Sequence, residues 1–342
     1  MGAPVEFMRR SEILGAFGPD GITKSAPAYG GIGTITDDTQ MTLFTAEGLL
    51  RACVRGKSRG MCDVPSVVSH AYLRWLLTQG MRPAKTDDEM GDGWLFQQRA
   101  LHSRRAPGHA CLTALKAAKA FGDPACNDSK GCGGVMRAAP VGLMGWSCNW
   151  DAQEVFRTGI ELAALTHGHP TGQLPAGVLA VLILALIDGA SLQEGLAAAK
   201  GMLKNEARHS ETTRAVEAAE ALAASSAPPH EAIAQLGQGW IAEEALAVSI
   251  YCALTAGAFR QGVILAVNHD GDSDSTGSIT GNLLGAMHGV KAIPAAWLEP
   301  LELRDVIAEM AEDLHACRDW GIGEFSENRE FGERIWRKYP GW

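Results

Sequence analysis

Apolar residues recur at three- and four-residue spacing along most of the chain, and clean period-two alternation is hard to find. The helical spacing is combined with a high content of Ala and Leu, which favour helices. The clearest segments are 41–54, 64–78, 109–121, 152–166, 191–204, 211–224 and 301–316. The pattern predicts an all-α bundle of ten or more helices, in which glycine-rich connections carry the chemistry.

The longest apolar run, LPAGVLAVLILALIDG at 174–189, is shorter than the roughly 20 residues that cross a bilayer, so we expect a buried helix. No stretch of biased composition divides the sequence, and SSAPPHE at 225–231 is typical of a turn between helices. No repeat of fixed period indicates a solenoid. We therefore predict one domain over residues 1–342, without a membrane partner.

The chain has 342 residues, of which 46% are hydrophobic and 20% are charged, a composition typical of soluble globular proteins. Its net charge of −9 argues against a nucleic-acid partner, because such binding needs many Lys and Arg residues. The eight cysteines form no C-x-x-C pairs and the N-terminus lacks a signal-peptide pattern. These features favour reduced thiols and a cytoplasmic location.

The segment NHDGDSDSTGS, residues 268–278, places three aspartates at alternate positions. Capping of a helix that starts near Ser275 would account for one of them, but not for all three. A calcium loop of the EF-hand type would need Gly at the sixth position and Glu at the twelfth, where this chain has Ser275 and Gly281. A different cation site is the better explanation.

A second acidic pair, Asp37 and Asp38, lies between Thr36 and Thr39, directly before an apolar-periodic helix that begins near Met41. Each cluster taken alone could be an ordinary helix cap. Taken together, their carboxylate, hydroxyl and carbonyl oxygens suit Mg, Mn or Ca rather than Zn. The sequence does not show whether the two clusters meet.

Four motifs occur in the order TDDTQM (36–41), GCGGVMRAAPVGL (131–143), LTHGHP (165–170) and GDSDSTGSITGNLLGAMHG (271–289). Together they resemble the ADP-ribosylglycohydrolase family, over roughly residues 2–289. The resemblance implies an all-α fold with two divalent cations, Mg²⁺ or Mn²⁺, in a cleft where ADP-ribose is cut from a modified side chain. It also implies six metal ligands: Thr36, Asp37, Asp38, Asp272, Asp274 and Ser275. Asp270 does not match a ligand and is expected to support or cap.

Further matches are to residues around the substrate. Glu6, in GAPVEF, resembles the family's glutamate above the metals, so Glu6 and Asp38 are the candidate catalytic carboxylates; an exposed terminal Glu is the alternative for Glu6. The glycine-rich segment implies that Gly133, Gly134, Val135 and Met136 offer backbone amides to the ribose or diphosphate, unless the segment is only a turn. His167 is implied to contact the diphosphate or to have a structural role.

Two departures from the family pattern concern the N-terminus and the loop RRAPGH at 104–109. Family members generally carry a helix before the GAPVEF segment, and this sequence opens at Met1 without it. Some members have an acidic residue where this chain has Ala106 and Pro107. Activation of water is therefore expected to depend on the cations and on Asp38 or Glu6.

The resemblance implies metal-dependent hydrolysis of the N-glycosidic bond of ADP-ribosylated protein side chains, with release of ADP-ribose. Arginine is the favoured linkage, because Ser rather than Thr at position 275 is closer to the arginine-directed members. Two alternatives remain open. One is a metal phosphohydrolase of the HD type, which the His269-Asp270 dipeptide and the helical pattern would suit; the other is a non-catalytic protein that binds ADP-ribose or a partner.

Overall fold

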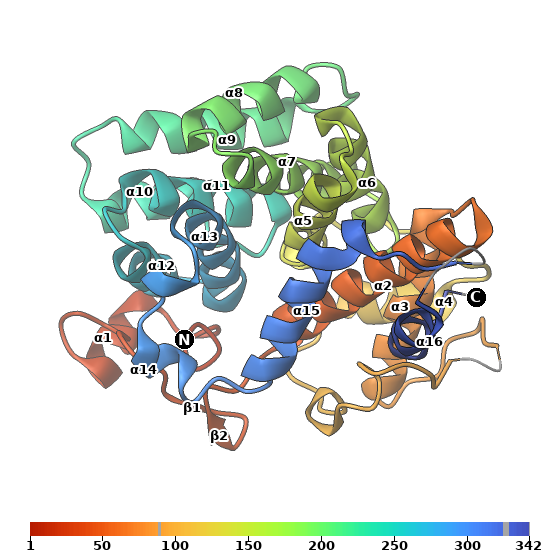
Figure 1. Cartoon of the computed structure of the whole chain (residues 1–342). Helices are drawn as coiled ribbons and strands as arrows, with labels where there is room; N and C mark the ends of the chain where they lie inside the picture. Colours follow the sequence, from red (N-terminus) through yellow and green to blue (C-terminus); the bar gives the residue numbers. More distant parts are fainter. Residues whose placement is uncertain (88–89, 324–327, 342) are drawn as a thin grey trace.

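The structure is a computed structural model that describes residues 1–87, 90–323 and 328–341. Within these residues the chain forms sixteen α-helices, four short 3-10 helices and one small hairpin, which confirms the all-α prediction (Figure 1). The α-helices are α1 (Arg10–Phe17), α2 (Asp37–Arg59), α3 (Val64–Thr78), α4 (His109–Ala117), α5 (Ala139–Cys148), α6 (Ala152–Ala164), α7 (Pro170–Ile187), α8 (Leu192–Leu203), α9 (Ser210–Ala223), α10 (Pro229–Leu236), α11 (Ala242–Thr255), α12 (Phe259–Val267), α13 (Ser273–His288), α14 (Ala295–Leu298), α15 (Arg304–Ala316) and α16 (Arg329–Lys338). The 3-10 helices are η1 (Arg99–Leu101), η2 (Cys132–Gly134), η3 (Val290–Ala292) and η4 (Cys317–Asp319).

All seven segments singled out by their periodicity are helical, although several boundaries differ. Helix α3 has the predicted bounds, because Asp63 caps its start by accepting a hydrogen bond from the Ser66 amide. Helix α4 stops at Ala117, short of the predicted end, and the chain turns where the Asp123 carboxylate accepts from the Ala120 amide. Helices α2 and α13 begin earlier than expected, at Asp37 and Ser273.

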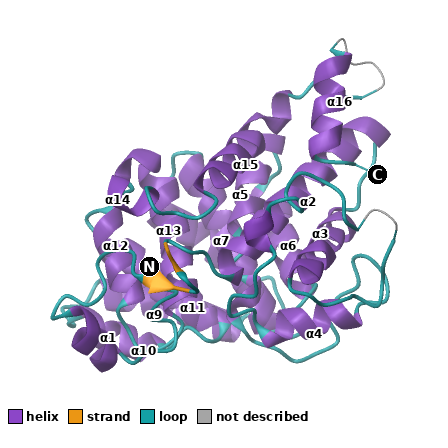
Figure 2. Cartoon of the chain, turned by 90° about the horizontal axis from the view of Figure 1, so that it is seen from below, coloured by secondary structure: helices purple, strands orange, loops and turns teal. Residues whose placement is uncertain are grey.

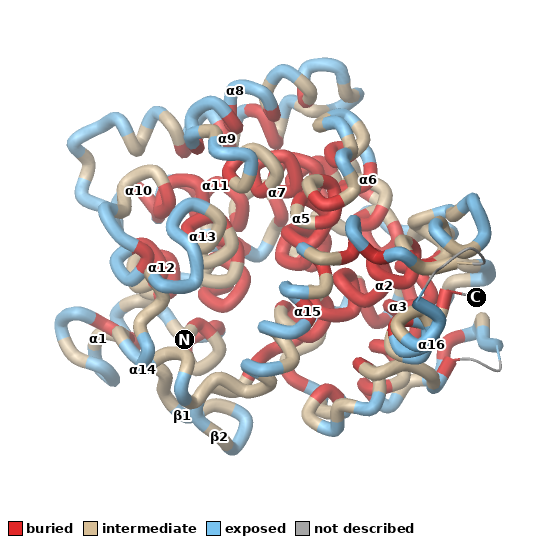
Figure 3. The backbone as a smooth tube through the Cα atoms, in the orientation of Figure 1, coloured by how far each residue is buried: buried red, intermediate tan, exposed pale blue. Residues whose placement is uncertain are grey.

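Helix α7 is the centre of the fold and contains most of the long apolar run. Packed against α5, α6, α8 and α11, it lies in the buried region at the middle of Figure 3. It is the one helix of the described residues that is long and apolar enough to cross a membrane, and 72% of that window is buried inside the protein. A helix that is apolar on all faces is buried, as the sequence predicted.

Helices α2 and α3 pack side by side and enclose a charged group with almost no solvent exposure. Glu47 of α2 accepts hydrogen bonds from Arg51 at 2.9 Å and from Arg74 of α3 at 2.6 Å, and all three side chains are fully buried. The two guanidinium groups lower the pKa of Glu47, although burial acts in the opposite direction. The ion pair between Glu47 and Arg74 joins α3 to α2, the helix that carries the first acidic cluster at its N-terminus.

The strands β1 (Pro27–Ala28) and β2 (Gly31–Ile32) form an antiparallel hairpin near the N-terminus (Figure 2). Its turn residues have positive φ, with Tyr29 at 49° and Gly30 at 84°, as a tight hairpin turn requires. Beyond the hairpin, Glu302 accepts from the Ile35 amide at 3.0 Å and makes a two-point ion pair with Arg105. This contact ties the segment before α2 to two distant loops.

Candidate metal centre and substrate cleft

The N-termini of α2 and α13 meet and bring the two acidic clusters together, which the sequence left open. Asp37 and Asp38 lie in the first turn of α2, and Asp274 lies in the first turn of α13. One carboxylate oxygen from each of these three residues lies within 4.8 Å of the others, and all three side chains are buried. Such a spacing is suited to shared coordination of a cation.

The carboxylates repel one another in a poorly solvated place, and their pKa values show this. Burial and the charge of Asp274 raise the pKa of Asp37 to about 8. The same two causes raise the pKa of Asp38 well above its usual range. One oxygen of Asp38 and one of Asp274 are buried without any hydrogen-bond partner. Buried carboxylates without partners are costly, so this cluster is suited to the binding of a cation.

The other three predicted ligands lie around the same two helix starts. Thr36 is the N-cap residue of α2, and its side chain makes no capping hydrogen bond. Asp272 is the N-cap residue of α13; one of its oxygens accepts from the Ser275 amide at 3.2 Å and the other from the Cys132 thiol at 2.9 Å. Ser275 is buried beside them. Thus all six predicted ligands gather at one place, and their coordination stays a prediction.

Asp270 lies outside this group. Its carboxylate accepts a hydrogen bond of 2.5 Å from the backbone amide of Arg10, the first residue of α1. The neighbouring His269 is also turned away, with its ring nitrogens near the Asp270 carbonyl and the Thr276 hydroxyl, each at 2.9 Å. Asp270 therefore occupies a capping position at α1, in keeping with the supporting role expected for it.

Glu6 is buried, with only 6% of its surface exposed, so it is not an exposed terminal residue. The segment that carries it folds as a tight turn, in which the Val5 amide donates to the Gly2 carbonyl at 2.8 Å. Gly2 packs so closely on α13 that a Cβ atom there would lie 2.3 Å from the Ser273 carbonyl oxygen. Burial and the charge of Asp274 raise the pKa of Glu6 to about 9. One Glu6 oxygen has no hydrogen-bond partner.

A cleft of about 470 Å³ opens over the carboxylates. Its lining combines the acidic cluster, the loop before α4 and the glycine-rich segment: Glu6, Phe7, Asp37, Asp38, Ala106, Pro107, Gly108, His109, Ala110, Cys111, Gly131, Cys132, Gly133, Met136, His167, Trp240, Asp272, Asp274 and Ser275. The cleft wall therefore combines the acidic cluster with residues of the glycine-rich segment, and the contact of their amides with a ligand stays a prediction.

Two of the four predicted residues of the glycine-rich segment line this cleft, Gly133 and Met136. A Cβ atom at Gly133 would lie 2.8 Å from the Cys111 sulfur, so only glycine fits there. Gly134 packs instead against helix α6 and the Gly172 carbonyl, and Val135 is fully buried. Gly133 therefore packs against Cys111 and His167 in the cleft wall, while Gly134 serves helix packing.

His167 lies in the cleft wall with 1% of its surface exposed. Burial, with a smaller effect from the charge of Arg137, lowers the pKa of His167 to about 3, so its ring is neutral at neutral pH. Its Nδ1 atom lies 2.8 Å from the Thr166 hydroxyl, which accepts from Arg137 at 2.7 Å. The fixed neutral ring can offer one nitrogen to a ligand.

Some cleft residues carry no signal that sequence reasoning used. The Cys132 thiol donates a hydrogen bond to the carboxylate of Asp272, one of the predicted metal ligands. Phe7 and Trp240 stack with ring centroids 5.8 Å apart at the cleft, and both are exposed, Phe7 by 72%. Phe7 follows Glu6, and this adjacency was the one available clue; nothing in the sequence around Trp240 placed it here.

The loop before α4 lies over Asp37 although it lacks an acidic residue. The Gly108 amide donates to the Asp37 carboxylate at 3.2 Å, and the Asp37 amide donates to the Arg105 carbonyl at 3.1 Å. Ala106 has a positive φ of 51°, which is uncommon for a residue with a side chain. The loop supplies backbone groups at the point where other family members were expected to supply a carboxylate.

The donor set fits a hard divalent cation. It consists of carboxylate and hydroxyl oxygens, it is buried, and two of its acids, Asp38 and Asp274, each have an oxygen without a partner. Mg²⁺, Mn²⁺ and Ca²⁺ prefer such oxygens. A divalent ion would compensate the repulsion that raises the pKa values of Asp37 and Asp38.

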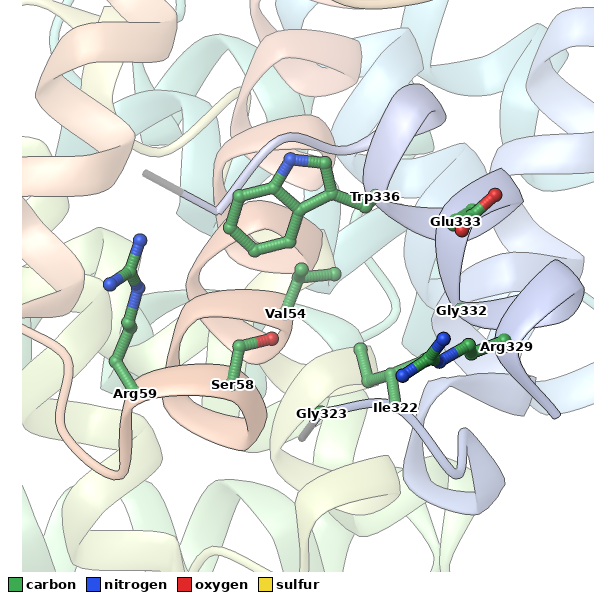
Figure 4. Close-up of a pocket in the computed structure, with 9 residues that line it drawn as sticks. All are labelled: Val54, Ser58, Arg59, Ile322, Gly323, Arg329, Gly332, Glu333 and Trp336. Atoms are coloured by element: carbon green, nitrogen blue, oxygen red, sulfur yellow. The ribbon is translucent and has the colours of Figure 1, made fainter. Parts of the chain in front are cut away.

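A second hollow, of about 380 Å³, lies at the other end of α2 and has a different character (Figure 4). It is lined by Val54, Ser58, Arg59, Ile322, Gly323, Arg329, Gly332, Glu333 and Trp336. Two guanidinium groups and a single carboxylate do not make a site for a hard cation. The carboxylate cleft is therefore the candidate functional site.

A helical domain with buried acidic residues at the starts of two helices defines the class of the protein, and comparison with known families gives that class its name. Residues 1–322 match the ADP-ribosylglycohydrolase family. The chain therefore belongs to the ADP-ribosylglycohydrolase family, as its four motifs indicated. Membership supports ADP-ribosyl hydrolase activity, and the family acts on ADP-ribosylated substrates with release of ADP-ribose.

Individual relatives are distant. The chain is 26% identical over 309 residues to the ADP-ribosyl-[dinitrogen reductase] glycohydrolase of Rhodospirillum rubrum, which covers 89% of this chain and 86% of that protein. It is 25% identical over 214 residues to the ADP-ribosylhydrolase ARH3 of Bos taurus, covering 55% and 58% of the two chains. A solved ADP-ribosylglycohydrolase-related protein complex superposes with a TM-score of 0.64 at 26% identity, covering 93% of this chain and 95% of the other.

Proposed function

We propose that this protein hydrolyses the N-glycosidic bond between ADP-ribose and a protein side chain, with arginine as the preferred linkage. The observation that carries the proposal is the buried group Asp37, Asp38 and Asp274, which lies in the wall of a cleft that also contains Gly133 and His167. Cations at the carboxylates and backbone amides opposite them would together accommodate a ribose and a diphosphate.

Two divalent cations, Mg²⁺ or Mn²⁺, would be held by the six oxygen ligands Thr36, Asp37, Asp38, Asp272, Asp274 and Ser275. When bound, they supply charge compensation and a water of lowered pKa next to the ribose hydroxyls. The ribose is thereby oriented by the starts of α2 and α13.

The proton transfers fall to carboxylates of the chain. Glu6 is buried and lies on the same cleft, and burial with the charges of the neighbouring aspartates raises its pKa to about 9, above neutral pH. Cations held by the aspartates would offset those charges and lower the pKa of Glu6, so that its carboxylate could take a proton from water and return it to the leaving group. Asp38 is the second candidate for the base, because one of its oxygens has no hydrogen-bond partner. The loop at Ala106 contributes no acid to this step.

The remaining cleft residues would position the substrate. The Gly133 backbone can approach a phosphate closely, since no side chain intervenes. The neutral His167 ring can donate a hydrogen bond to an anionic oxygen if its free nitrogen carries the proton. Positive charge that develops on the ribose during bond cleavage is stabilised by the acidic group.

The deciding experiment is incubation with proteins ADP-ribosylated on arginine, serine or glutamate, with Mg²⁺ or with EDTA. We expect release of intact ADP-ribose, fastest from arginine, and no release in EDTA. Mass spectrometry of the target protein measures the residual adduct. Preferred cleavage of the serine linkage would overturn the arginine preference, and a phosphoribose left on the protein would indicate a phosphohydrolase instead.

The two alternatives make different demands on the site. A phosphohydrolase of the HD type would need His269 and Asp270 as ligands, but both are turned away from the acidic group. A non-catalytic protein would bind ADP-ribose and show no turnover at high protein concentration. The position of Glu6 over the cleft favours catalysis over binding alone.

A further inference from the structure

Three cysteines from distant parts of the chain meet at one point away from the cleft. Cys53 lies in α2, Cys148 is the last residue of α5, and Cys317 begins η4. Their three sulfur atoms all lie within 4.8 Å of one another. The family motifs contain none of these residues, and neither the carboxylate site nor the substrate cleft uses them.

A fourth sulfur atom completes the group. The Met144 thioether lies one turn before Cys148 on α5, with its sulfur 3.3 Å from the Cys148 sulfur and 3.7 Å from that of Cys317. Met144 and Cys317 are buried, whereas Cys53 and Cys148 are only partly buried. Four soft donors thus converge, and two of them can be reached from solvent.

The surroundings favour ionisation of one thiol, that of Cys148, whereas hydrogen bonding with Cys148 raises the pKa values of Cys53 and Cys317, so these two thiols lose their protons only when a metal ion displaces them. Lys57 lies one turn after Cys53, and its ammonium group donates to the carbonyls of Arg318 and Trp320 at 2.9 and 3.1 Å. Hydrogen bonds from the thiols of Cys317 and Cys53 lower the pKa of Cys148, and the positive charge of Lys57 acts in the same direction. A thiolate is the form that binds metals.

The group is remote from the carboxylates. Asp38 lies in the first turn of α2 and Cys53 is fifteen residues further along the same helix, which corresponds to about 22 Å at 1.5 Å per residue. A ligand at the sulfur atoms is therefore separate from the substrate cleft. The donor types differ as well, since one site offers only oxygen and the other only sulfur.

We propose that Cys53, Cys148 and Cys317, with Met144 as a fourth donor, bind one soft metal ion, and that Cu(I) is the ion this group fits best. Thiolate and thioether ligands select Cu(I), whereas zinc sites use Cys, His and carboxylates without Met. Sulfur atoms that share one ion at about 2.3 Å are roughly 3.8 Å apart in tetrahedral geometry, so small side-chain rotations would suffice.

Binding of Cu(I) releases protons from the thiols and changes no oxidation state. Each thiol that coordinates releases its proton to solvent, so three thiolates and one Cu(I) leave two negative charges, which Lys57 partly offsets. The ion would join α2, α5 and η4, adding to their packing and to the hydrogen bonds that Lys57 of α2 makes to the carbonyls of Arg318 and Trp320. It therefore stabilises the folded chain.

The test is an anaerobic titration of the reduced full-length protein with Cu(I) in acetonitrile, with Mg²⁺ present throughout and bicinchoninate as competitor. We expect one Cu(I) per chain, an ultraviolet thiolate-to-copper absorption band and a higher melting temperature. Cys148→Ser should weaken binding at least tenfold, and because Cys148 ends its helix and is partly exposed, this variant should fold. Cys126→Ser is the matched control, since Cys126 is exposed and outside the group.

Three results would overturn the proposal. Equal loss of Cu(I) in Cys126→Ser and Cys148→Ser would indicate unspecific thiol binding. Tighter binding of Zn²⁺ than of Cu(I) in a parallel titration would reject the copper assignment. A Cys53–Cys148 disulfide in the freshly isolated protein, found by alkylation and mass spectrometry, would make the group a redox pair. None of these outcomes depends on the hydrolase activity, so this proposal and the proposed function can fail separately.

Discussion

At the scale of single residues, Asp38 and Asp270 both lie in acidic clusters of the sequence, but their carboxylates have different surroundings in the structure. Asp38 is buried with an oxygen that has no partner, whereas Asp270 accepts from the backbone of α1. Replacing each of them in turn therefore compares the loss of a predicted metal ligand, Asp38, with the loss of a helix cap, Asp270.

We predict that Asp38→Ala abolishes turnover, because a ligand and candidate base is lost, while helical circular dichroism is unchanged. The variant should unfold at a higher temperature than the metal-free wild type, since a buried carboxylate without a partner is removed. Asp270→Ala should keep most of the activity and lose about 1 kcal/mol of stability through the lost cap. Initial rates and thermal melts measure both effects; if Asp270 were as indispensable as Asp38, the assigned register of the motif would be wrong.

At the scale of elements, the buried charges between α2 and α3 hold the helix that carries the first acidic pair. Glu47 compensates two guanidinium groups, Arg51 and Arg74, none of which reaches solvent. Such a network stabilises the fold only while it is complete, because each charge has lost its hydration.

We predict that Glu47→Gln destabilises the protein by about 3–5 kcal/mol, since the buried Arg74 loses its carboxylate partner and Arg51 keeps only Asp92, at 2.8 Å. Urea unfolding in the presence of Mg²⁺ measures the loss. Glu161→Gln is the control, because its ion pair with Arg157 is exposed, 3.7 Å long and expected to contribute less than about 1 kcal/mol. Equal effects of the two substitutions would show that the network between α2 and α3 contributes no more than a surface pair.

Features that depend on contacts between neighbouring residues could be predicted from the sequence, whereas features that depend on contacts between distant residues could not. Helix α3 was predicted with both ends from its apolar spacing, and its start is fixed by a local contact, the cap at Asp63. The end of α4 was not predicted, because it depends on a turn at Asp123. The acidic clusters were recognised from their composition, but their meeting, like the placement of Trp240 and the convergence of three cysteines, depends on tertiary contacts that no local pattern encodes.

At the scale of the whole molecule, the acidic group is a site of stored repulsion that binding of cations would relieve. The chain has a net charge of −9, so its other residues do not supply a net positive charge that would offset the repulsion among these carboxylates. Folding and cation binding are therefore linked.

We predict that Mg²⁺ or Mn²⁺ at a hundred times its dissociation constant raises the melting temperature by about 4 °C per bound ion, from roughly 2.7 kcal/mol of binding energy and the usual unfolding entropy. Differential scanning calorimetry after exhaustive chelation gives the reference. Sodium at equal ionic strength and the Asp38→Ala variant are the controls. An unchanged melting temperature, with full activity after chelation, would refute the metal site.

The ion pair between Arg105 and Glu302 has a consequence for where the chain can be shortened. Every residue that lines the cleft precedes position 276, and the remaining residues could look dispensable. Glu302, however, accepts hydrogen bonds from the Ile35 amide, in the segment before Asp37, and from Arg105, in the loop that lies over Asp37. A protein truncated after α13 would keep its complete set of cleft side chains and still lose their alignment, so the segment needed for an intact cleft extends past the last residue that lines it.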